Sequence, residues 1–146
     1  MRSSETEAAQ NDGTRSGLTA NLVASGLAAS AGVHAGLVPE HLRETPELRV
    51  SFVLATGLLL AVATWIALCP DDWRAVRSAR FLVAGLLIAY LVSRTVGIPF
   101  FQPEVEHVDA LGLSTKAVEV LALLCALRLG RTLGGRRSPL TQEVAR

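Results

Sequence analysis

The sequence has few of the residues that support soluble enzymes or disulfide-bonded folds. Its 146 residues include two cysteines, one tyrosine and a single lysine, Lys116, and only 18% are charged. Cys69 and Cys125 form no CxxC pair, which argues against a disulfide framework or a zinc–thiolate site. The net charge of +1 is too small for a nucleic-acid-binding protein. No Ser/His/Asp, phosphate-binding or zinc-hydrolase motif is present, so we expect a protein that is not an enzyme.

Long apolar runs dominate what is present. Half of the residues are hydrophobic, and the mean hydropathy is +0.38. Four runs each approach the roughly 20 residues that a helix needs to cross the hydrocarbon of a bilayer. They cover residues 18–38, 48–68, 81–98 and 111–129. We predict an all-α bundle of four transmembrane helices over residues 18–130, between a disordered polar tail (1–17) and a basic tail (131–146).

The basic residues predict the orientation of this bundle. If both termini and the 69–80 loop share one side, ten of the fourteen basic residues lie there. The positive-inside rule then makes that side, with both termini, cytoplasmic in a bacterial plasma membrane. The ten are Arg2, Arg15, Arg74, Arg77, Arg80, Arg128, Arg131, Arg136, Arg137 and Arg146.

An alternative topology follows from "ASA" at residues 29–31, which has the shape of a signal-peptidase site. Cleavage there would leave three spans. The preceding tail argues against it, because it carries acidic residues where a signal peptide has a basic patch.

The opposite face collects all three histidines and several carboxylates. In "AGVHAGLVPEHLRE", residues 31–44, His34 ends the first span, and we expect Pro39 to begin a short interfacial helix. The 94–116 segment, which the topology predicts on the same side, carries further acidic residues and a histidine. Imidazole with carboxylate suits zinc, copper, iron or nickel. We therefore hypothesise an outer-face pocket for a divalent metal with the ligands His34, His41, Glu44, Glu106, His107 and Asp109.

Other interpretations of this face stay open. No HxxxH pair or Cys or Met cluster supports the metal, so the same residues also suit a solvated loop. A haem between His34 and His107 is disfavoured, because four-helix cytochromes carry axial histidines inside their spans. A metal pocket would serve uptake, handling or sensing of the ion. Without a ligand, the chain would be an accessory or scaffold subunit of a larger membrane complex.

Two ionisable residues fall within or beside the spans. Arg94 is near the outer end of the third span, and Glu119 is about two turns into the fourth. A lone carboxylate in hydrocarbon costs several kcal/mol, so we predict that Glu119 faces the bundle. We expect a buried ion pair with Arg94, with Lys116 three residues away on the same helix face. The pair would fix the helix order or bind a proton or cation.

Small residues in the first span predict close helix contacts. The pairs are Gly26-xxx-Ser30, Gly32-xxx-Gly36 and Ser25-xxx-Ala29. They suit packing inside the bundle or a homo-oligomer contact in the lipid bilayer.

The order of several short motifs resembles a group of small four-span membrane proteins of high-GC Gram-positive bacteria, which carries no assigned reaction. The likeness covers most of residues 34–119 and implies the same four-span fold. The residues that carry it are His41, Leu42 and Glu44; Ser93, Arg94, Gly97 and Pro99; Glu106 and Asp109; and Glu119.

The ten-to-four division of basic residues generates a topology prediction. In a chain whose two native cysteines are replaced by serine, Ser138→Cys should resist a membrane-impermeant thiol reagent in intact cells. Gln102→Cys should react with it, because the 94–116 segment is expected outside. The reverse labelling pattern would overturn the orientation and the outer site with it.

Overall fold

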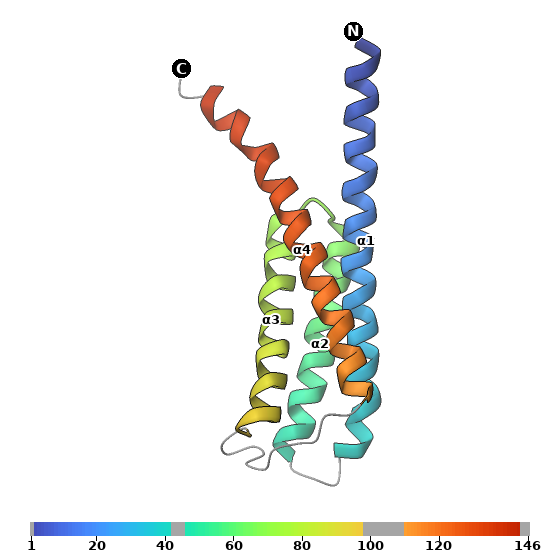
Figure 1. Ribbon diagram of the computed structural model, residues 1–146, viewed down its shortest axis with the longest axis vertical. Helices are drawn as coiled ribbons and strands as arrows, with labels where there is room; N and C mark the ends of the chain where they lie inside the picture. The colour runs from blue at the N-terminus through green and yellow to red at the C-terminus, as the bar shows by residue number, and fades with distance from the viewer. Residues whose placement is uncertain (1, 42–45, 98–109, 144–146) are drawn as a thin grey trace.

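The computed structural model describes residues 2–41, 46–97 and 110–143. Within these ranges all regular secondary structure is helical, and the chain forms four antiparallel helices (Figure 1). The predicted all-α bundle is confirmed. The helices are α1 (Arg2–His41), α2 (Pro46–Leu68), α3 (Trp73–Thr95) and α4 (Ala110–Glu143).

Each helix contains a segment long and apolar enough to cross a membrane. The segments are Gly13–Pro39, Arg49–Leu68, Trp73–Thr95 and Ala110–Gly135. Only 22–28% of each is buried inside the bundle, so most of its apolar side chains face outward. A soluble monomer rarely exposes an apolar surface of this extent. The chain is therefore a small multi-pass membrane protein whose outer surface contacts the lipid bilayer.

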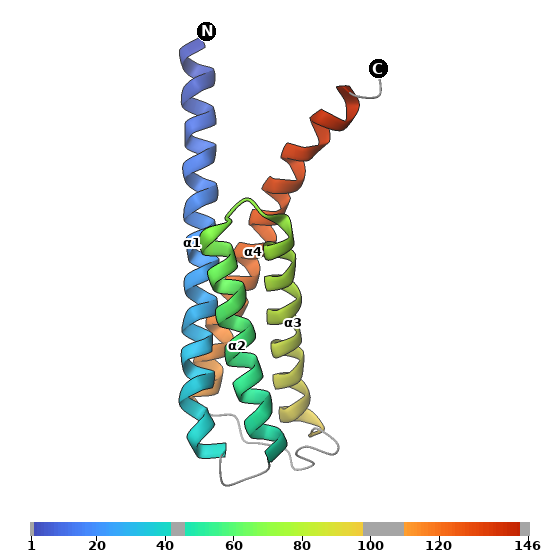
Figure 2. The ribbon, with the colours of Figure 1, turned by 180° about the vertical axis from the view of Figure 1, so that it is seen from behind.

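Two helices are longer than the predicted spans. α1 begins at Arg2 and passes through Pro39 to His41, and α4 continues to Glu143. Residues 2–17 and 131–143, expected as tails, thus extend these helices beyond α2 and α3 at one end of the bundle (Figures 1 and 2). Pro39 lies in the last turn of α1, so the lost hydrogen bond and any kink that it causes affect few helical residues.

Local chemistry sets the ends of α3. The side chain of Asp72 accepts a hydrogen bond from the backbone N–H of Arg74 at 2.9 Å, which caps the first turn. At the other end, Gly97 has φ of 73°. This left-handed conformation, which a glycine adopts without steric cost, terminates the helix.

A close contact between small residues brings α1 and α4 together. A Cβ atom added to Gly26 would lie 2.9 Å from the Cβ of Ala122, so the two helices approach closely there. A Cβ on Gly32 or Gly36 would meet open space. The Gly26-xxx-Ser30 pair therefore packs inside the bundle, whereas Gly32-xxx-Gly36 does not.

An arginine joins α3 to α4 nearer the end that holds the termini. Nε and Nη2 of Arg80 donate hydrogen bonds to the carbonyl oxygen of Ala126 at 3.1 and 2.9 Å, and Nη2 also donates to Leu127 O at 3.2 Å. Gly130 leaves room for the guanidinium, because a Cβ there would overlap it. Backbone carbonyls are suitable partners for a cation inside a membrane bundle.

The glycine contacts predict opposite effects of one substitution at two positions. Gly26→Ala should lower the free energy of unfolding by about 1–3 kcal/mol, because the added methyl overpacks the contact with Ala122. Gly32→Ala is the matched control and should be neutral or stabilise α1 by up to about 1 kcal/mol, since alanine favours helix and nothing is displaced.

Thermal unfolding in detergent, followed by circular dichroism, measures both effects. An equal loss of stability at the two positions would contradict the packing of α1 on α4 through Gly26.

Candidate functional site

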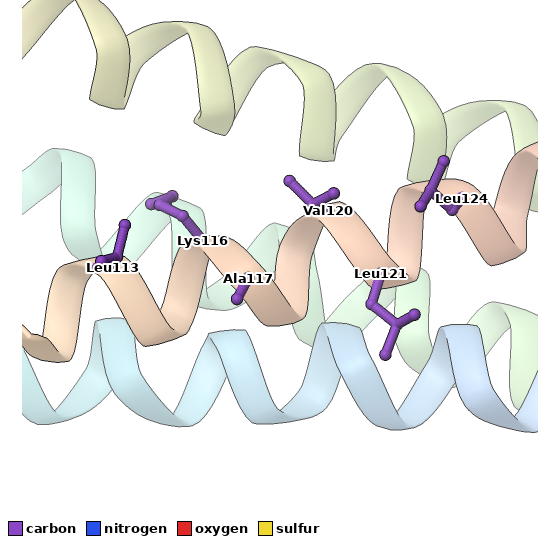
Figure 3. Close-up of a pocket in the computed structure, with 6 residues that line it drawn as sticks. All are labelled: Leu113, Lys116, Ala117, Val120, Leu121 and Leu124. Atoms are coloured by element: carbon purple, nitrogen blue, oxygen red, sulfur yellow. The ribbon is translucent and has the colours of Figure 1, made fainter.

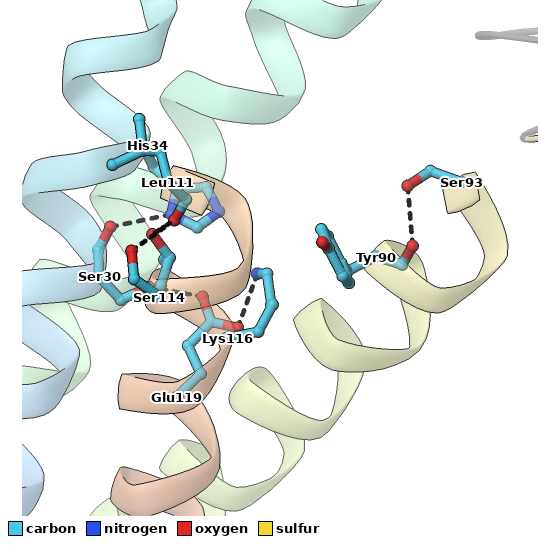
Figure 4. Close-up of polar contacts among 9 residues, drawn as sticks. Ser30, His34, Tyr90, Ser93, Leu111, Ser114, Lys116 and Glu119 are labelled. Carbon is cyan, nitrogen blue, oxygen red and sulfur yellow. Dashed lines mark hydrogen bonds and ion pairs between the residues drawn. The ribbon is translucent and has the colours of Figure 1, made fainter. Parts of the chain in front are cut away.

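A buried carboxylate lies at the centre of the candidate site. Glu119 on α4 is 1% exposed, which confirms that it faces the bundle interior. Its Oε1 accepts a hydrogen bond from Ser30 Oγ at 2.6 Å, and its Oε2 forms a 2.7 Å ion pair with Lys116 Nζ (Figure 4). Each carboxylate oxygen thus has a donor, which compensates part of the cost of removing the charge from water.

Helix periodicity and the glycine contact explain why these groups meet. Lys116 and Glu119 are three residues apart on α4 and share a face. Glu119 and Ala122 are also three residues apart, and Gly26 and Ser30 are one turn apart on α1. The approach of Gly26 to Ala122 therefore brings Ser30 to Glu119 on the next turn.

His34 follows Ser30 by one turn of α1. Its Nδ1 lies 2.9 Å from the backbone oxygen of Ser30, so Nδ1 carries the proton and donates it. In a neutral ring this leaves the lone pair on Nε2, the atom through which a histidine would accept a proton or bind a metal. The imidazole is buried, and its ring lies 5.7 Å from that of Phe52 on α2.

Tyr90 brings α3 into the same cluster. Its ring centroid lies 5.4 Å from Lys116 Nζ and 5.1 Å from Arg94 Cζ, both within the range of cation–π attraction. Figure 4 shows Tyr90 projecting from α3 toward Lys116. All four helices thus contribute to one cluster, made of Ser30, His34, Phe52, Tyr90, Arg94, Lys116 and Glu119.

The cation paired with Glu119 differs from the one expected. The sequence predicts an ion pair between Arg94 and Glu119, whereas in the structure the Glu119 carboxylate forms its ion pair with Lys116. Arg94 lies over the Tyr90 ring instead. Both cations come from the same end of the bundle, and α4 itself supplies the nearer one.

Most of the hypothesised metal ligands cannot be placed. The side chain of His41 and the residues Glu44, Glu106, His107 and Asp109 lie outside the described part of the chain. Among the residues whose side chains are described, no three His, Cys, Asp or Glu residues gather closely enough to hold a metal ion. Of the six proposed ligands, only the side chain of His34 is placed, so the metal shell stays a prediction.

Two members of the cluster were not recognised as polar partners from the sequence. The sequence pattern marks Ser30 only as a small residue in a helix-packing motif, and Tyr90 belongs to none of the predicted sites. A signal for Tyr90 was available, because the only tyrosine of the chain precedes Arg94 by four residues, the spacing of helix neighbours. The bond from Ser30 to Glu119 joins residues 89 positions apart, and no local pattern predicts it.

No family model, curated protein or solved structure matches the chain. The geometry of the cluster is therefore the basis for inferring a function.

The cluster predicts strong coupling between Lys116 and Glu119. Lys116→Met and Glu119→Gln should each lower the free energy of unfolding, because each leaves a charge without its partner. Breaking a buried pair costs about 3–5 kcal/mol, which is an upper limit here because the Lys116 side chain keeps 13% exposure. The double variant should lose less than the sum, as measured by thermal unfolding in detergent.

The control is the same set of single and double variants with Arg94→Met in place of Lys116→Met. Its coupling to Glu119→Gln should be smaller, because Arg94 contacts Tyr90 and Lys116 occupies the carboxylate. Additive losses for Lys116 and Glu119, with strong coupling for Arg94, would restore the pair expected from the sequence.

Proposed function

We propose that this membrane protein is not an enzyme and that it binds a cation at the end of the bundle where Glu119 and His34 lie. The observation that carries the proposal is the carboxylate buried at 1% exposure inside a membrane bundle. Ionisable residues within membrane spans are rare and commonly mark sites for ions or protons. The protein would take part in uptake, handling or sensing of the ion in a bacterial plasma membrane.

The contacts of Glu119 support exchange of its cation. Lys116 carries its ammonium on a flexible four-carbon stem, and this group also lies 5.4 Å from the Tyr90 ring. The ring offers the ammonium a second position when another cation occupies the carboxylate. A proton would act similarly, because a protonated Glu119 no longer holds Lys116 by charge.

The donor types favour a divalent metal. Glu119 offers carboxylate oxygens, Ser30 a hydroxyl oxygen and His34 an imidazole nitrogen. This mixture suits zinc, copper or iron. Further ligands would come from His41, Glu44, Glu106, His107 and Asp109. The ends of α1, α3 and α4 to which these residues connect, at His41, Thr95 and Ala110, share one end of the bundle (Figure 1).

One observation favours a second candidate function. Gly32 and Gly36 are exposed on α1, and a Cβ added to either would meet nothing within 4 Å. Such a face allows another helix to approach closely. The chain would then be an accessory or scaffold subunit that packs against a larger membrane complex or a second copy of itself.

Metal content after purification in detergent tests the cation proposal. Under this proposal the purified chain carries a near-stoichiometric amount of zinc, copper or iron. His34→Ala should lower the affinity at least about tenfold, because it removes an imidazole ligand. Glu47→Ala is the control, since Glu47 is an exposed residue in the first turn of α2.

Two results would contradict a metal site at His34. One is wild-type protein with no metal above the detergent blank. The other is equal metal retention by His34→Ala and wild type. A second protein that co-purifies in fixed ratio with a metal-free chain would favour the scaffold function.

A further inference from the structure

A groove runs along the outward face of α4. The groove is open and has a volume of about 580 Å³, and Figure 3 shows its side chains in two rows along the helix, one directed toward α3 and one toward α1. Residues three or four positions apart form such rows on a helix. The lining is apolar apart from one ammonium, and it consists of Leu113, Lys116, Ala117, Val120, Leu121 and Leu124.

The length and position of the groove match one lipid leaflet. At 1.5 Å per residue, the distance from Leu113 to Leu124 is about 16 Å. This is close to half of a hydrocarbon core about 30 Å thick. The groove starts within one turn of Ala110, where α4 begins, and runs toward the middle of the bundle. An acyl chain of the leaflet at this end would fill it lengthwise.

The outer part of the groove carries positive charge. Lys116 lines it and uses one of its three N–H donors on Glu119, which leaves two donors. Across from Lys116, Arg94 shares the Tyr90 ring with it. Two cationic side chains thus lie beside the same ring, and the two remaining donors of Lys116 suit an anionic group at the groove.

A buried hydroxyl adds a hydrogen-bond donor. The Oη atom of Tyr90 is buried and has no hydrogen-bond partner within the part of the chain that the structure describes. A buried hydroxyl without a partner is costly, and such groups are commonly satisfied by a ligand or water. The ring of Tyr90 lies 5.4 Å from the Lys116 ammonium, so the hydroxyl and the ammonium belong to one polar cluster beside the groove.

We propose that this groove binds an anionic phospholipid. The phosphate is held by Lys116, Tyr90 and Arg94, and one acyl chain lies along α4 between the two rows of side chains. The proposed lipid and cation sites share Lys116: while its ammonium is bonded to Glu119, its other two donors bind the phosphate. A zwitterionic lipid is disfavoured, since its quaternary ammonium would approach two cations.

Native mass spectrometry of the detergent-solubilised full chain tests the proposal. The probes are phosphatidylglycerol and phosphatidylcholine with identical acyl chains. The wild type should prefer phosphatidylglycerol by about tenfold, because the choline ammonium of phosphatidylcholine would approach two cations. Tyr90→Phe keeps the ring and its cation contacts but should weaken binding of both lipids several-fold, because each lipid carries the phosphate that the hydroxyl binds.

Filling the groove supplies a second variant that leaves the charged cluster intact. Leu121→Trp should weaken binding of both lipids, because the larger side chain occupies the path of the acyl chain. Leu58→Trp on α2 is the matched control, since Leu58 and Leu121 are similarly exposed, at 53% and 62%, and only Leu121 lines the groove.

Four outcomes would overturn the proposal. Equal retention of the two lipids by the wild type would remove the charge preference. Unchanged binding of both lipids by Tyr90→Phe would remove the hydroxyl from the site. Equal effects of the two tryptophan variants would mean non-specific lipid contact. Displacement of the lipid by soluble glycerol phosphate would make phosphate alone the ligand.

Discussion

The buried carboxylate of Glu119 is the constraint on which the position of α1 along α4 depends. A carboxylate in an apolar bundle is tolerated only with charge and hydrogen-bond partners. Lys116 supplies the charge from the same helix, and Ser30 supplies a hydroxyl from α1. Because the second partner lies on another helix, satisfying Glu119 also fixes how α1 sits along α4.

Two contacts at different depths hold α4 in this position. The close approach of Gly26 to Ala122 aligns α1 with α4 one turn from the carboxylate. Farther along α4, Arg80 reaches from α3 to the carbonyl oxygen of Ala126, over the space that Gly130 leaves. Both contacts need a glycine, because any side chain at either position would occupy the space of its neighbour. Apolar burial is slight in such a thin bundle, so a few polar and small-residue contacts set the helix positions.

The features that depend on one segment of the chain at a time are predictable from the sequence. Apolar run length predicts the four helices, and the cost of charge in hydrocarbon predicts that Glu119 faces inward. The partner of Glu119 was harder to predict, because Arg94 and Lys116 both belong to the same end of the bundle. Periodicity within α4 places Lys116 beside Glu119, whereas the distance from Arg94 to Glu119 depends on how α3 packs against α4, which the sequence does not give. The same holds for Gly26 and Gly32, which form similar motifs but face a neighbour and open space respectively.

Lys116 connects the two proposed sites, since it belongs to the carboxylate cluster and to the groove on α4. While Glu119 is paired with Lys116, its negative charge offsets the charge of the ammonium. When a cation binds Glu119 in place of Lys116, the carboxylate no longer offsets the charge of the Lys116 ammonium beside Arg94. The positive charge available to a phosphate then increases. Cation binding would therefore strengthen binding of an anionic lipid. By linkage, the lipid would strengthen cation binding by the same factor, because the coupling free energy between two sites is reciprocal.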